Sequence, residues 1–206
     1  RKMLIGISLG PGDPELLTLK AAAALKSCSR VFVPGEMASE LVRPYCRPER
    51  LDFPMIEDPE ELERIWKKNA AIVAETASSG IAAFACIGDV NTFSTFSHLE
   101  RMIRENYPGM EIQTIPGVGV VPALASRFPA PLEGSFTVSD GSSLDTVIRI
   151  KATRPRKLAG ELRERGFEEF VLGRMLCTPE EEIIRGTLPE KSDYFSVLLA
   201  RKKRKG

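Results

Sequence analysis

Short apolar runs alternate with longer segments of helical periodicity through the first half of the chain. The predicted strands are residues 3–9, 30–34, 50–53, 81–87 and 111–115, and the predicted helices are residues 15–26, 37–46, 59–78 and 96–105. Strands separated by helices need crossover connections, so this half predicts a mostly parallel sheet. The run 81–87 is apolar throughout, which is typical of a strand buried on both faces.

The pattern changes after Pro116-Gly117. Helices are predicted over 120–127 and 154–165, and strands over 135–139, 146–150, 169–173, 181–186 and 194–200. The last three strands leave no room for helices between them, so we expect them to be antiparallel, within a mixed sheet. The prediction is an α/β protein of two small α/β domains, residues 1–113 and 114–206, with a mostly parallel sheet in the first, a mixed sheet in the second and a ligand cleft between them.

Composition narrows the class of protein. The 206 residues are 43% hydrophobic and 28% charged, which is ordinary for a folded globular protein. A net charge of +1 does not favour a nucleic-acid partner. No apolar run approaches the ~20 residues of a membrane span, and the amino terminus lacks the apolar core of a signal peptide, so we expect a cytoplasmic protein that binds no membrane. The basic run 201–205 is predicted to be a solvated tail.

Cysteine and histidine are sparse. Cys28, Cys46, Cys86 and Cys177 stand far apart, without a Cys-x-x-Cys pair. We predict buried free thiols, with neither disulfides nor a metal site. The only histidine, His98, falls inside a predicted helix, where we expect a surface or packing role rather than a catalytic one.

Three loops carry the candidate chemistry, each between a predicted strand and a helix. The first, Gly10-Pro11-Gly12-Asp13-Pro14, has glycines that permit a tight turn and close approach to a ligand, and we expect free N–H groups at the start of the following helix. Plain connectors share this composition. The second begins at Gly88-Asp89. A carboxylate at the carboxyl end of a parallel strand lies where open α/β sheets bind ligands, and it can accept hydrogen bonds from ribose hydroxyls or an ammonium group. Alternatively, it caps the next helix. The third is Pro116-Gly117-Val118-Gly119.

In their order and spacing, these loops resemble the tetrapyrrole methylase family, and the likeness extends over essentially the whole chain. The matching stretches are residues 10–21, 88–89 and 115–118. Two further stretches, 93–97 and 194–199, resemble the precorrin-2 C-20 methyltransferases of cobalamin biosynthesis. There are departures: Val90 stands where the family usually has proline, and Gly119 and Val120 stand where close relatives have serines.

The resemblance implies a homodimeric enzyme that transfers methyl from S-adenosylmethionine to C-20 of precorrin-2 or cobalt-factor II, with the cofactor between the two domains. The implied cofactor contacts are Pro11, Ile87, Gly88, Asp89, Thr92, Ser94, Thr95, Gly119, Val120, Ala152 and Leu176. We assign no catalytic base.

A tetrapyrrole that carries many carboxylates would be attracted to a basic rim. The basic residues between positions 149 and 157 are the substrate-binding hypothesis, although a solvated helix face explains such a cluster equally well. They are Arg149, Lys151 and Arg154, together with Arg156 and Lys157. Arg127 and Arg174 are weaker candidates for the same role.

Other functions stay open. Within the family these are methylation of uroporphyrinogen III, methylation at another corrin position, and diphthine synthesis. From other classes, a nucleotide- or phosphate-binding module and a non-catalytic regulatory protein are the alternatives. The lysine and Ser/Thr of a phosphate-binding P-loop are missing, and Asp13 would repel phosphate.

Overall fold

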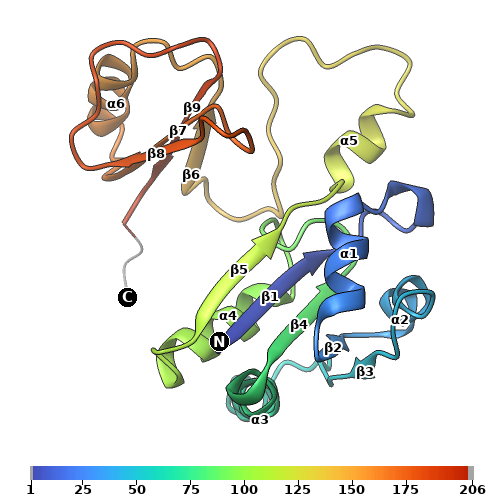
Figure 1. Ribbon diagram of the computed structural model, residues 1–206. Coiled ribbons are helices and arrows are strands. Elements are labelled where there is room, and N and C mark those ends of the chain that lie inside the picture. The colour runs from blue at the N-terminus through green and yellow to red at the C-terminus, as the bar shows by residue number, and fades with distance from the viewer. Residues whose placement is uncertain (1, 204–206) are drawn as a thin grey trace. The chain divides into compact units, whose positions relative to one another are not determined.

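The first half of the chain forms a five-stranded parallel sheet, as predicted. The computed structural model describes residues 2–203. The strands are β1 (Met3–Ser8), β2 (Arg30–Val33), β3 (Glu49–Arg50), β4 (Ile81–Cys86) and β5 (Glu111–Ile115). Their order is β3-β2-β4-β1-β5, so β1 lies between β4 and β5 (Figure 1). All the paired strands are parallel, with Ser8 opposite Cys86 and Ile7 opposite Ile115.

Helices cover both faces of this sheet. They are α1 (Leu19–Ser27), α2 (Glu36–Val42), α3 (Pro59–Ser79) and α4 (Phe96–Asn106), followed after β5 by the short α5 (Val120–Ala125). The apolar sides of α3 and α4 pack on Leu4 and Phe84. Those of α1 and α2 pack on Ile7 and Ala85 from the other side. Neighbouring residues of β4 therefore serve opposite cores, which explains its continuous apolar sequence.

Local signals decide where the helices begin. Asp58 accepts hydrogen bonds from the Glu60 and Glu61 N–H groups, which caps α3. The predicted helix from residue 15 begins later than expected, because Pro14–Leu16 form a 3₁₀ turn capped by Asp13. The helix α1 then starts at Leu19, and its first turn is capped by Thr18.

The second half forms a four-stranded sheet with one helix. Its elements are β6 (Thr146–Arg149), α6 (Pro155–Glu164), β7 (Glu169–Arg174), β8 (Glu182–Arg185) and β9 (Ser196–Arg201). The order is β6-β9-β7-β8, and every pair is antiparallel. The prediction of a mixed sheet in this half was therefore wrong. The reason is that β6 pairs with the last strand rather than with β7, the strand that follows its helix. Ala159 and Leu162 of α6 join Leu172 and Leu198 in the core of this unit.

Contacts divide the chain into two compact units, Arg1–Phe136 and Thr137–Gly206, whereas the predicted domains meet between residues 113 and 114. Residues 114 and 115 continue β5, and the Gly117 N–H donates to Asp89, which ties this stretch to the first unit. No strand forms over 135–139, where the side chains are exposed. Arg201 belongs to β9 rather than to a tail, and Arg204 and Lys205 lie outside the described residues. Within residues 2–203, no helix is long and apolar enough to cross a membrane.

Candidate functional site

The loops that follow β1, β4 and β5 leave the same edge of the first sheet. These three strands are adjacent and parallel, so their carboxyl ends lie side by side (Figure 1). In open α/β sheets, ligands bind at this edge. The sheet therefore brings together the three motifs that the sequence singled out: the Gly10 loop, the Gly88 loop and the Gly117 loop.

Gly10 and Gly88 join the first two loops directly. The Gly88 N–H donates to the Gly10 carbonyl at 2.7 Å, and the Gly10 N–H donates to the Gly88 carbonyl at 3.2 Å. Both residues have left-handed backbones, with φ of 73° and 78°. A Cβ on Gly10 would lie 2.9 Å from the Leu16 carbonyl oxygen, whereas one on Gly88 would meet no atom of residues 2–203 within 4 Å. The backbone of Gly88 thus borders open space, where a ligand can approach it closely.

The carboxylate of Asp89 links all three loops. Its Oδ2 accepts a hydrogen bond from the Gly117 N–H at 2.9 Å and a longer one from the Ser8 hydroxyl at 3.4 Å. Its Oδ1 accepts from the Asn91 N–H at 2.9 Å and from the Thr92 hydroxyl at 3.3 Å. Both oxygens are therefore engaged within the protein. The side chain organises the loops and caps its own turn, which is nearer to the capping alternative than to a free carboxylate.

The remainder of the Gly88 loop holds two hydroxyls and a strained aromatic residue. Ser94 Oγ accepts from the Phe96 N–H at 3.1 Å and contacts Cys86 Sγ at 3.1 Å, so it caps the start of α4. Thr95 is half-buried beside it. Phe93 has a φ of 48° and its side chain is 67% exposed. A left-handed backbone is a genuine outlier for a bulky residue, and such strain is found preferentially at ligand sites.

The third loop approaches Asp89 closely. A Cβ on Gly117 would lie 2.6 Å from that of Ser8, and one on Gly119 would lie 3.8 Å from that of Asp89. Gly119 precedes α5, and Val120 is exposed at its first position. Pro11 is half-buried directly after Gly10. The first unit thus holds nine of the eleven predicted cofactor contacts on its three loops.

The other two predicted contacts, Ala152 and Leu176, lie in the second unit. Ala152 is fully buried and its N–H donates to the Ser196 carbonyl, so its side chain faces the core. Leu176 is half exposed and folds over Gly173, at 2.7 Å from the position of a Cβ there. Left-handed residues stand beside both: Lys151 before Ala152, and Met175 and Cys177 on either side of Leu176.

The basic residues differ in what holds them. Arg156 Nε donates to the Leu188 carbonyl at 3.0 Å, and Lys157 lies 3.9 Å from Glu161. Among the described residues, Arg149 and Arg154 form no ion pair. Lys151 lies 5.2 Å from the centre of the Tyr194 ring, and its hydrogen bond with Tyr194 raises the pKa of its ammonium group. Within residues 2–203, Arg149 and Arg154 are therefore the members of the cluster without an ion-pair partner, and Lys151 is held by Tyr194 alone.

The weaker candidates are held by neighbours. Arg127 donates to the Ala123 carbonyl at 2.9 Å at the end of α5. Arg174 pairs with Glu182 at 2.6 Å and with Asp193 at 3.1 Å, so its charge is already neutralised. Both have structural partners within their own unit.

His98 and most of the cysteines serve packing. The His98 ring stacks on Trp66 with centroids 4.1 Å apart, which confirms the predicted packing role. Its burial and the nearby Arg101 charge lower its pKa. Burial raises the pKa of Cys86, and burial together with Cys46 raises that of Cys28 to about 11. Cys177 is exposed, contrary to the prediction of burial, because it lies on the loop after β7.

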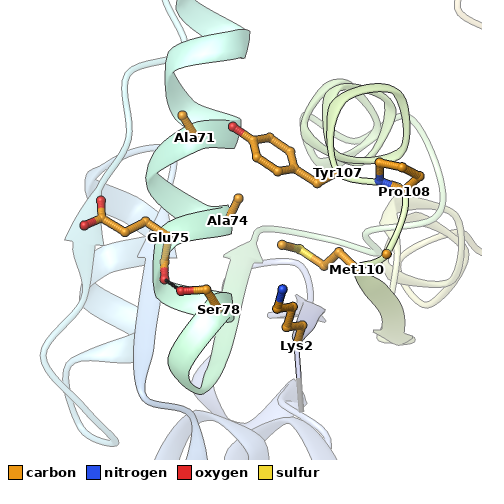
Figure 2. Close-up of a pocket in the computed structure, with 9 residues that line it drawn as sticks. Lys2, Ala71, Ala74, Glu75, Ser78, Tyr107, Pro108 and Met110 are labelled. Carbon is orange, nitrogen blue, oxygen red and sulfur yellow. Dashed lines mark hydrogen bonds between the residues drawn. The ribbon is translucent and has the colours of Figure 1, made fainter.

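A hollow of about 440 Å³ lies at the opposite edge of the first sheet. Figure 2 shows Tyr107 and Met110 beside α3, where Ala71 and Ala74 leave room. Lys2 stands directly before β1 and Met110 directly before β5, so the hollow adjoins the amino ends of the strands. It shares no residue with the three loops.

Sequence reasoning missed Ser8 and Phe93. Ser8 is 1% exposed and ends an otherwise apolar strand, and that single polar residue was its only signal. The strain at Phe93 left no trace in the residue types. Gly117 was noted as part of a turn, but its bond to Asp89 depends on β5 lying beside β1.

The comparisons with known proteins agree with these motifs. Residues 3–192 match the family model for Tetrapyrrole (Corrin/Porphyrin) Methylases. The chain belongs to the tetrapyrrole methylase family. A protein of Methanocaldococcus jannaschii named probable cobalt-precorrin-2 C(20)-methyltransferase is 28% identical over 98% of this chain and 96% of its own length. The cobalt-precorrin-2 C(20)-methyltransferase of Salmonella typhimurium is 32% identical over 63% of this tetrapyrrole methylase and 58% of its own length. Among solved structures, a uroporphyrin III C-methyl transferase of Thermus thermophilus is 21% identical, with a TM-score of 0.47 and coverage of 97% of both chains.

Proposed function

We propose that this protein transfers a methyl group from S-adenosylmethionine to C-20 of precorrin-2 or its cobalt form. The observation that carries the proposal is the match to the Methanocaldococcus jannaschii C(20)-methyltransferase over nearly the full length of both chains. The Salmonella typhimurium match points to the same reaction. Tetrapyrrole methylases use S-adenosylmethionine, so family membership supports this cofactor.

The residues of the first unit fit such a cofactor. A Cβ on Gly12 or on Gly88 would meet no atom of the described part of the chain within 4 Å, so both positions leave space for a bound molecule. The backbone groups of Pro11, Ile87 and Gly88 would contact it, with Gly119 and Val120 opposite them. Thr95 offers a hydroxyl, whereas the Thr92 hydroxyl donates to Asp89 Oδ1 and Ser94 is engaged in capping α4. Backbone contacts also tolerate Val90, where the family has proline.

In the second unit, the proposed contacts are the backbone beside Ala152 and the exposed Leu176 side chain. All four left-handed residues other than glycine within residues 2–203 adjoin a predicted cofactor contact. Each such residue costs about 1–3 kcal/mol and persists only where the surrounding structure enforces it. Their placement therefore supports the assignment of Ala152 and Leu176.

S-adenosylmethionine supplies a methyl group already activated by the positive sulfur. The protein therefore needs no nucleophile of its own, and its work is to hold the two reactants in line and to exclude water. The bonds between Gly10 and Gly88 and those of Asp89 connect the three loops to one another, which favours such alignment.

Substrate carboxylates would pair with Arg149, Lys151 and Arg154. All three are exposed, and charge-assisted hydrogen bonds to carboxylates are the strong kind. Tyr194, which lies beside Lys151, and Phe195, which packs edge-on against Tyr194, are also exposed and offer ring faces to a flat macrocycle. A substrate of this shape and charge is what these side chains suit.

We also propose a homodimer. Apolar side chains are exposed along α5 and the segment after it, and a second copy would cover them. They are Val120, Leu124, Phe128, Leu132 and Phe136. Sedimentation equilibrium should give twice the mass of the chain, and the mass of a single chain at micromolar concentration would contradict this proposal.

The test of function is direct. The protein is incubated with methyl-labelled S-adenosylmethionine and either precorrin-2 or cobalt-factor II, and the new methyl group is located by NMR. Label at C-20 is expected. Label at another carbon, or on uroporphyrinogen III instead, would move the protein to another branch of the family.

A matched pair of variants shows whether the Gly88 loop is responsible. Gly88→Ala and Gly166→Ala both place a side chain on a left-handed backbone without a steric neighbour, with φ of 78° and 88°. Only Gly88 lies on the predicted site. Gly88→Ala should lose cofactor binding and Gly166→Ala should retain it.

A nucleotide-binding module is less well supported. Asp13 accepts from the Glu15 N–H at 2.9 Å, and Thr18 caps α1, so the first turns of both helices already have acceptors. Calorimetry with S-adenosylmethionine and with ATP separates the two functions. If the protein bound ATP but did not bind S-adenosylmethionine, the methyltransferase proposal would be refuted.

A further inference from the structure

Ser8 is the buried link between the three loops of the first unit. Its hydroxyl accepts from the Val90 N–H at 2.9 Å and donates to Asp89 Oδ2 at 3.4 Å. The same carboxylate oxygen accepts from the Gly117 N–H at 2.9 Å. One hydroxyl and one carboxylate therefore connect the end of β1 to the loops after β4 and β5. We call these three residues, Ser8, Asp89 and Gly117, the loop clamp.

We propose that Ser8 is a positioning residue for cofactor binding, and that the carboxylate of Asp89 acts through the loop clamp rather than by contact with the cofactor. The inference rests on the proposed function for the identity of the ligand. Ser8 is 1% exposed and Val90 is 2% exposed, so neither is accessible to a ligand. Any effect of Ser8 on binding must pass through the loops.

The geometry explains why position matters. Gly117 approaches Ser8 so closely that a Cβ would lie 2.6 Å from the serine Cβ, and the clamp thus fixes the spacing between β1 and the third loop. Asp89 Oδ1 meanwhile holds the Asn91 N–H and the Thr92 hydroxyl. A reaction that needs reactants aligned within about 1 Å depends on this spacing.

The alternative role for Asp89 is direct contact with the cofactor. A substitution at Ser8 distinguishes that role from action through the loop clamp. Removing the Ser8 hydroxyl takes away one donor to the Asp89 carboxylate and the side-chain acceptor of the Val90 N–H. If Asp89 acted only by touching the cofactor, this change would alter affinity without speeding hydrogen exchange in the loop after β5.

The experiment compares Ser8→Ala with Thr76→Val, both in the full chain. Thr76 is also a buried hydroxyl, 6% exposed, and it accepts from Arg30 Nη1 at 3.0 Å. It lies near the end of α3, away from the three loops. Affinity for S-adenosylhomocysteine is measured by calorimetry, and hydrogen exchange by mass spectrometry over peptides that contain residues 88–92 and 116–119.

Ser8→Ala should weaken S-adenosylhomocysteine binding roughly three- to tenfold, the range expected for one hydrogen bond, and should speed exchange in both peptides. Thr76→Val should do neither. Wild-type affinity and exchange in Ser8→Ala would overturn the proposal, and so would equal weakening by Thr76→Val, because that would indicate a general loss of stability.

A second variant approaches the clamp from the other side. Asp89→Asn keeps the side-chain size but places a donor where one acceptor oxygen stood, so exchange at 116–119 should also speed up. In the Asp89→Asn background, Ser8→Ala should add less to the loss of affinity than it does alone. Full additivity would contradict the clamp. A wild-type protein that fails to bind S-adenosylhomocysteine would refute the proposed function, while the exchange measurements would still decide the clamp.

Discussion

Gly117→Ala tests the close approach of the third loop to β1. The new methyl group would lie 2.6 Å from the Ser8 Cβ, whereas ordinary carbon–carbon contacts are about 3.5–4.0 Å. Both atoms are attached directly to the backbone, so neither can rotate away. The loop must therefore move by about 1 Å, and the hydrogen bond from the Gly117 N–H to Asp89, now 2.9 Å, would lengthen beyond bonding distance.

The size of the effect follows from these two losses. Overpacking costs about 1–3 kcal/mol and a lost hydrogen bond about 0.5–1.5 kcal/mol. Outward movement of the loop relieves part of the overpacking, so that penalty is not felt in full. We therefore expect the free energy of unfolding to fall by about 2 kcal/mol. Affinity for S-adenosylhomocysteine should fall at least tenfold, because the displaced loop carries Gly119 and Val120.

Urea denaturation and calorimetry measure the two quantities. The control is Gly109→Ala, on the turn before β5, where a Cβ would meet no atom within 4 Å. That variant should keep its affinity and gain up to about 1 kcal/mol, since alanine restricts the unfolded chain. If Gly117→Ala matched the wild type in both measurements, the close packing of the third loop on Ser8 would be refuted.

Four other outcomes can be checked. Burial and the Arg101 charge lower the pKa of His98, so the folded state binds its proton more weakly than the unfolded state and stability should fall as the pH drops below about 6.5. NMR of this single imidazole should give a value below 6.5, and a value above it would contradict the assignment. Gly160→Ala, inside α6 with open space around it, should stabilise the protein by about 0.5–1 kcal/mol in urea denaturation. Phe93→Gly should relieve about 1 kcal/mol of backbone strain yet weaken cofactor binding. Unchanged binding would show that the strained backbone at Phe93 has no role in the cofactor site. Arg154→Ala should raise KM for the tetrapyrrole several-fold with little change in kcat, and a reduced kcat alone would argue against a role in substrate binding.

The sequence was sufficient to predict the loops that form the candidate site. Apolar runs followed by Gly-Pro or Gly-Asp mark strand ends, and crossover helices require parallel strands, so the loops at Gly10, Gly88 and Gly117 were each expected between a strand and a helix. The family resemblance, carried by residues 10–21, 88–89 and 115–118, was confirmed by the match over residues 3–192. These features depend on local residue types, which a single sequence displays.

What could not be predicted depends on contacts between distant residues. The hydrogen bond from the Gly117 N–H to Asp89 forms because β4 and β5 lie on either side of β1, which brings the loops after them together. No local sequence pattern indicates this strand order. Likewise, β6 pairs with β9 rather than β7, which makes the second sheet antiparallel throughout. The run 135–139 has the residue types of a strand but no partner strand, and so it stays irregular.

The paired hydrogen bonds between Gly10 and Gly88 have a consequence for footprinting experiments. Residues 78 positions apart in the sequence share two backbone bonds, so the loops after β1 and β4 must open and close together. A ligand that touches only one of them will slow solvent exchange in both. Slower exchange in the segment that contains Pro11 therefore reports both ligand contact and the hydrogen bonds between Gly10 and Gly88. Only substitution of individual residues distinguishes these two causes.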